Sequence, residues 1–71
     1  MKRSTEELIA EALSHAREKH PIWPHNEFEA MSIITEEVGE LAQALNDGDE
    51  NQARVEAGHV LATVIRFLEG E

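Results

Sequence analysis

The sequence predicts an all-α subunit of three helices, in which the second and third form an antiparallel hairpin. Three observations support this. Apolar side chains recur at intervals of three and four residues along three segments. Each segment follows an N-cap residue that has Glu or Gln three positions later. Loop and turn residues separate the segments. In none of the three segments do apolar and polar residues alternate as they would in a strand.

Residues 5–19 are expected to form the first helix. Ser4 followed by Glu7 has the spacing of a capping box, and the helix should end before Pro21. One face carries the apolar stripe Leu8, Ile9, Ala12, Leu13 and Ala16. The following residues 20–25 contain two prolines, which remove backbone donors and favour extended geometry, so they are expected to form a loop.

The second helix is expected to begin after Asn26, which has Glu29 three positions later, and to end near Asn46. Its main apolar face centres on Val38 and is expected to be buried. The other members of that face are Phe28, Met31, Ile34, Leu41, Ala42 and Leu45. A second arc, next to a group of glutamates, holds Ala30, Ile33 and Ala44, so this helix is expected to be covered on two faces.

The third helix should follow the Asp47–Gly48 turn, with Asp49 as N-cap and Gln52 three positions later. Its expected core residues are Val60, Leu61, Val64, Ile65, Phe67 and Leu68. Because so few residues join it to the second helix, the two should pack antiparallel. Glu40 and Glu56 lie about seven residues on either side of the turn, and should therefore face each other.

The composition indicates one small domain, residues 1–71, without cysteine. A chain of this length buries only roughly 60% of its unfolded surface. We therefore expect a homodimer or homotetramer that completes a four-helix-bundle-like core. The N-terminus lacks the apolar core of a signal peptide, and the apolar run Val60–Leu68 is too short to span a bilayer. A cytoplasmic protein is expected.

The formal net charge of −9 excludes several kinds of partner. Nucleic acid requires a basic face, and an anionic membrane surface would repel this chain. A nucleotide that arrives together with metal ions remains compatible with the charge.

Acidic and imidazole side chains lie at helical spacing within two core-forming segments. Glu36, Glu37 and Glu40 belong to the second helix, and Glu56 and His59 to the third. Carboxylates that converge across a hairpin are the usual ligands of a hard divalent cation. Taken alone, however, a pair of glutamates is more often solvated, and a lone histidine is more often a core residue. The facing positions of the two groups favour a metal site.

These residues resemble a known pattern. EEVGELAQAL (Glu36 to Leu45) followed by EAGHVLATVIRFL (Glu56 to Leu68) is similar to the EExxE and ExxD motifs of MazG-type all-α nucleoside triphosphate pyrophosphohydrolases. The resemblance implies hydrolysis of a (d)NTP to its monophosphate and pyrophosphate, with Mg²⁺ or Mn²⁺. It implies metal ligation by Glu37, Glu40 and Glu56, and a catalytic role for Glu36.

The chain departs from that pattern at His59, which stands where the family has aspartate. Imidazole can ligate a metal, but it adds no negative charge and favours Mn²⁺, Zn²⁺ or Fe²⁺ over Mg²⁺. Such families also usually have a fourth helix. A catalytically impaired nucleotide-binding or oligomerisation module is therefore an alternative. A third reading is a di-iron bundle, since Glu56-x-x-His59 has ExxH spacing, but such bundles usually repeat ExxH within one chain.

The loop and its flanks hold three candidate substrate-binding residues. Trp23 is the only tryptophan and could stack on a nucleobase, with Asn26 reading its edge and Lys19 meeting the phosphates. Each also has a structural reading. Trp23 can plug the end of the bundle, Asn26 can simply cap the second helix, and Lys19 can be a surface charge.

Overall fold

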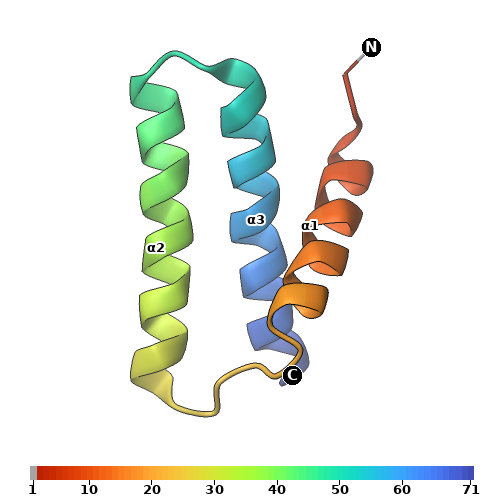
Figure 1. Cartoon of the computed structure of the whole chain (residues 1–71), viewed down its shortest axis with the longest axis vertical. Coiled ribbons are helices and arrows are strands. Elements are labelled where there is room, and N and C mark those ends of the chain that lie inside the picture. The colour runs from red at the N-terminus through yellow and green to blue at the C-terminus, as the bar shows by residue number, and fades with distance from the viewer. Residues whose placement is uncertain (1) are drawn as a thin grey trace.

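The computed structural model describes residues 2–71, which form three α-helices and, within that range, no strand. The helices are α1 (Thr5–Lys19), α2 (Glu27–Asn46) and α3 (Glu50–Glu69). α2 and α3 form an antiparallel hairpin, and α1 packs against α3 (Figure 1). Within residues 2–71, α1 and α2 do not pack against each other. α3 is thus the central helix, and the predicted all-α class and hairpin are confirmed.

The N-caps explain why the predicted helix boundaries are confirmed. The Ser4 side chain accepts a hydrogen bond from the Glu7 backbone N–H, and Glu7 accepts one from the Ser4 backbone N–H, which completes the capping box. Asp49 caps α3 by accepting from the Gln52 N–H. Gly48 has φ of +71°, a left-handed conformation that glycine adopts readily, and this allows the tight turn between α2 and α3.

Small side chains let α1 approach α3 closely. A Cβ added at Gly58 would lie 3.1 Å from the backbone oxygen of Leu8, which is tight for such a contact. Ala12 of α1 and Ala62 of α3 are both buried. The expected stripe of α1 is confirmed, because all of its residues are buried or half-buried. The α1–α3 interface therefore depends on the absence of a side chain at Gly58.

The expected core of the hairpin is wrong in part. In α2, Val38 is 46% exposed and Leu45 64% exposed, and the residues buried there are Ala30 and Ala44 of the second arc. In α3, Leu61, Phe67 and Leu68 are exposed. The buried residues of α3 are instead Ala53, Glu56, Gly58, Ala62, Thr63 and Arg66. Small residues permit close helix approach, so the larger apolar side chains point to flanks that no other helix of the described chain covers.

None of the helices in the described range is long and apolar enough to cross a membrane.

Candidate metal centre

Three carboxylates converge where α2 faces α3. One oxygen from each of Glu37, Glu40 and Glu56 lies within 4.8 Å of the others. Glu37 and Glu40 lie close to one turn apart on α2, and the hairpin places Glu56 opposite them. The predicted register therefore brings these side chains together.

The cluster has no lysine or arginine partner among residues 2–71. The ion pairs of Lys and Arg in this range join Lys2 to Glu50, Arg3 to Glu11, and both Arg17 and Arg66 to Glu71. Oxygen Oε2 of Glu37 is buried without a hydrogen-bond partner. A buried, unpaired carboxylate oxygen is costly, so this arrangement is suited to a bound cation.

The electrostatics of the cluster reflect this crowding. Burial raises the pKa of Glu37, and the nearby charge of Glu40 raises it further. The pKa of Glu40 is raised chiefly by a hydrogen bond shared with Glu56, then by partial burial and the charge of Glu56. Both shifts favour protonation when no cation is present. A divalent cation would reverse this preference by stabilising the ionised forms.

Gln52 orients the most buried carboxylate. Glu56 is only 8% exposed, and its Oε1 accepts a hydrogen bond of 3.1 Å from Nε2 of Gln52, one turn earlier on α3. Hydrogen bonds of this kind fix the direction in which a metal ligand points. In the sequence Gln52 indicates an N-cap pattern with Asp49, and its i, i+4 spacing to Glu56 is the signal for this hydrogen bond.

His59 lies beside the cluster. Its Nδ1 is 3.8 Å from Oε2 of Glu37, so a protonated imidazole would form an ion pair there. The ring is also 6.0 Å, centroid to centroid, from that of His15 on α1. His59 is not one of the three residues whose ligand atoms converge within 4.8 Å. It therefore contacts the site through Glu37.

A cleft of about 660 Å³ adjoins the carboxylates, because α1 and α2 diverge on one side of α3. Glu36, Glu37, Glu40 and His59 line it from α2 and α3. Lys19 and Trp23 line it from the end of α1 and the following loop. This volume lies in the range of small-molecule sites. We call this space the acidic cleft.

A buried arginine of α3 also lines the acidic cleft. Arg66 is 3% exposed, its guanidinium lies 5.4 Å from the Trp23 ring centroid, and Nη1 donates to the backbone oxygen of Ala16. Its Nη2 is buried without a hydrogen-bond partner. Trp23, 6% exposed, thus packs beneath Arg66 as well as lining the cleft. In the sequence, the one signal for a buried Arg66 is its position as the single charged residue within the apolar run Val60–Leu68.

Asn26 acts as the N-cap of α2. Its Oδ1 accepts hydrogen bonds from the backbone N–H groups of Phe28, at 2.8 Å, and Glu29, at 3.4 Å. It is not among the residues that line the acidic cleft.

The donor set fits a hard divalent cation. All three groups offer carboxylate oxygens, the ligand type that Mg²⁺, Mn²⁺ and Ca²⁺ prefer. Two ligands on opposite sides of Mg²⁺ are about 4.2 Å apart, and those of Ca²⁺ about 4.6 to 5.2 Å apart. Of three ligands on one octahedral ion, at least two pairs lie at right angles, about 3.0 Å apart for Mg²⁺. The three oxygens, which lie within 4.8 Å of one another, would therefore have to draw together to close on Mg²⁺.

Comparisons of the chain with protein-family models, curated proteins and solved structures found no match.

Proposed function

We propose that this protein is a metal-dependent nucleotide pyrophosphohydrolase that converts a (d)NTP to its monophosphate and pyrophosphate. The observation that carries the proposal is the convergence of three carboxylates, without a lysine or arginine partner in the described chain, at the edge of a nucleotide-sized cleft. The resemblance of the two acidic motifs to the MazG type supplies the reaction class.

In this proposal Glu37, Glu40 and Glu56 hold Mg²⁺ or Mn²⁺. When bound, the ion neutralises charge on the phosphate oxygens and lowers the pKa of a coordinated water. Glu36 is exposed and lines the acidic cleft on the same helix, where it accepts a proton from the attacking water. The water oxygen bonds to the α-phosphorus, the bond to the bridging oxygen breaks, and pyrophosphate leaves.

The wall of the acidic cleft formed by the end of α1 and the following loop suits the phosphates and base of a nucleotide. Lys19 supplies a positive charge that can contact the phosphates, and the edge of Trp23 offers an aromatic surface to a base. Because Trp23 is buried beneath Arg66, its contribution is to shape the end of the cleft as well as to contact a base.

The proposed partners are therefore the nucleotide, the metal ion and a second copy of the chain. Self-association is supported by the small core, since no large side chain in residues 2–71 is fully buried.

The experiment is a pyrophosphate-release assay on purified protein with a panel of NTPs and dNTPs, with Mg²⁺ or Mn²⁺. We expect release that requires the metal and is lost in Glu40→Gln. The matched control is Glu18→Gln on the exposed surface of α1, which should keep full activity. Release that persists in Glu40→Gln would contradict the proposal.

His59→Asp separates the enzyme from its impaired alternative. An added carboxylate beside Glu37 should strengthen Mg²⁺ binding and raise Mg²⁺-dependent turnover. Nucleotide binding without pyrophosphate release in both forms would instead favour the binding module. The specific observation behind that alternative is that His59 lies beside the converging carboxylates and is not one of them.

A further inference from the structure

The flank of the hairpin opposite the acidic cleft carries large exposed apolar side chains in two rows. In α2, Met31, Val38 and Leu45 recur every seven residues and are 62%, 46% and 64% exposed. In α3, Leu61 and Leu68 are also seven apart, and are 42% and 73% exposed. Half-buried Ile34, Leu41, Ala57 and Val64 lie between these rows. We call these nine residues the apolar flank.

The spacing along α2 is that of a helix-packing seam. Phe28, Met31, Thr35, Val38, Ala42 and Leu45 alternate steps of three and four residues, and all are exposed. Such a 3-4 repeat keeps one line of a helix directed at a neighbouring helix. Within the described chain no helix occupies that position, because α1 packs on α3 alone.

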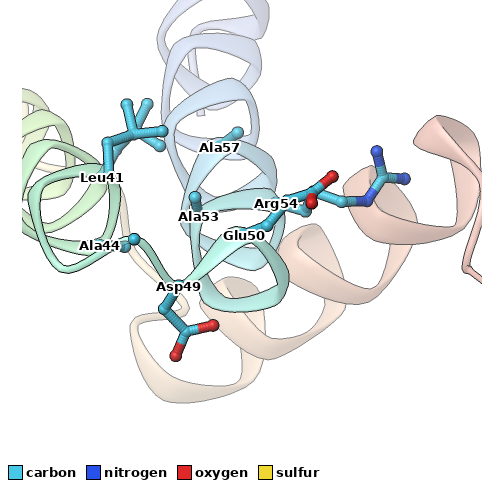
Figure 2. Close-up of a pocket in the computed structure, with 9 residues that line it drawn as sticks. Leu41, Ala44, Asp49, Glu50, Ala53, Arg54 and Ala57 are labelled. Carbon is cyan, nitrogen blue, oxygen red and sulfur yellow. The ribbon is translucent and has the colours of Figure 1, made fainter.

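The apolar flank is hollowed near the α2–α3 turn. A groove of about 360 Å³ runs between Leu41 and Ala44 of α2 and Ala53 and Ala57 of α3, as Figure 2 shows. Asp49, Glu50 and Arg54 also line it. The small alanines leave room for a larger side chain from outside. Knobs from a neighbouring helix can therefore fit between the two rows.

The exposed area indicates how much surface needs a partner. The chain exposes 5133 Å², whereas a stable monomer of 8.0 kDa exposes about 4,450 Å². The surplus of about 700 Å² is close to the 800 Å² or so that each partner loses in a stable interface. One interface of standard size would therefore remove it.

We propose that two copies of this chain pack their apolar flanks together as a two-fold symmetric dimer of hairpins. The nine residues of the apolar flank are uncharged, while each copy has a formal charge of −9. The charged side chains Asp49, Glu50 and Arg54 line only its end near the α2–α3 turn. Two such copies can approach only through an uncharged surface, and a basic partner would choose the acidic surface instead. A pair of antiparallel rows is also self-complementary under a two-fold axis.

In this dimer the four helices of two hairpins enclose a common apolar core, and the two acidic clefts lie on its outer sides. The proposal does not depend on the metal site, so either can fail without the other.

Light scattering coupled to size exclusion, across a range of concentrations of the full chain, tests the proposal. We expect a mass of twice 8.0 kDa, and an association that tightens with added salt as repulsion between the copies is screened. Val38→Glu or Leu61→Glu would bury a charge in the interface and should weaken association by about a hundredfold or more. Ala10→Glu, on the exposed surface of α1, is the charge-matched control and should stay dimeric.

A second measurement guards against variants that simply fail to fold. The chain has no cysteine, so Leu61→Cys and Ala10→Cys each introduce a single thiol. Mild oxidation should link Leu61→Cys into a covalent dimer much faster than Ala10→Cys. A wild type that stays at 8.0 kDa at every concentration, or equal linking of both thiols, would overturn the proposal.

Discussion

The two flanks of the α2–α3 hairpin are built from the same helices but need different partners. One flank carries Glu37, Glu40 and His59 beside the acidic cleft, with a buried carboxylate oxygen left without a hydrogen bond. The other carries Val38 and Leu61, with large apolar surface left exposed. The carboxylates of the first flank lack a lysine or arginine partner, and the apolar side chains of the second lack a packing partner. Both faces of one small hairpin can therefore lack a partner in the isolated chain.

Because the flanks lie on opposite sides of the hairpin, substitutions on one should act independently of the other. The strongest prediction concerns Glu56→Gln, which keeps the shape of a buried ligand and removes its charge. We expect metal affinity to fall more than about 100-fold. This exceeds the loss of about 10- to 100-fold that is usual when a residue that hydrogen-bonds to a metal ligand is replaced. The oligomeric mass should not change.

Val38→Glu is the reciprocal variant. It should lower the oligomeric mass and leave metal affinity unchanged. Calorimetric titration with Mn²⁺ and light scattering on both proteins measure the two properties. If Val38→Glu abolished metal binding while its helix content was intact, the two flanks would not be separable.

Gly58→Ala should affect the cleft flank alone. The added Cβ would lie 3.1 Å from the Leu8 backbone oxygen, so α1 must shift away from α3. We expect a loss of about 1–3 kcal/mol in unfolding free energy and weaker nucleotide binding, with an unchanged dimer.

Gly39→Ala is the matched control for Gly58→Ala, since no atom outside its own helix lies within 4 Å of its added Cβ. It should stabilise the protein by about 0.5–1 kcal/mol, because alanine loses less backbone entropy in a helix. Urea unfolding measures both. Equal effects of the two substitutions would show that the close approach of α1 to α3 is not tight.

Gln52→Leu should have a smaller effect on metal binding than loss of a ligand. It removes the hydrogen bond to Glu56 Oε1 and leaves the ligand in place, so we expect about tenfold weaker binding. Gln43→Leu is the control, because Gln43 donates to Asp47 on the exposed surface of α2. Unchanged affinity in Gln52→Leu would show that Glu56 is held by its packing alone.

The smallest effect is a pH dependence of the metal-free protein. Glu37 and Glu40 have folded-state pKa values raised above 4.5. Between pH 4.5 and those raised values, the folded state therefore binds more protons than the unfolded state. Stability should therefore fall as pH rises from 4.5 through the raised values. Glu71, whose pKa is lowered by Arg17, acts in the opposite sense below 4.5.

Thermal unfolding at a series of pH values, with and without Mg²⁺, measures this dependence. The decline above pH 4.5 should be shallower in Glu40→Gln and should disappear with saturating metal, which binds the ionised carboxylates. A metal-free protein that became steadily more stable from pH 4.5 to 7 would contradict the assignment of the two raised pKa values.

Local signals predicted the fold well. The capping patterns at Ser4, Asn26 and Asp49 fixed the start of each helix, since each satisfies backbone donors within its own first turn. The register of Glu40 against Glu56 also followed from the short turn, because the hairpin leaves little freedom to slide.

The choice of buried face could not be predicted in the same way. Helical periodicity shows that a stripe is apolar, but it does not show which neighbour covers it. Val38 and Leu61 belong to well-formed stripes, yet the buried residues include Ala44 of α2 and Ala53 of α3, because small residues allow the helices to approach closely. The burial of Arg66 was missed for a related reason, since two of its partners, Trp23 and Ala16, come from other parts of the chain.

The most direct test of the central claim is calorimetric titration of the full chain with Mn²⁺ near neutral pH, in two buffers of different ionisation enthalpy. We expect saturable binding near neutral pH and, because the pKa values of Glu37 and Glu40 are raised before the ion binds, a release of protons that grows as the titration is repeated at lower pH. Glu37→Gln should weaken that binding and reduce the proton release. Absence of saturable binding, or binding unaffected by Glu37→Gln, would contradict the claim that these carboxylates form a metal site.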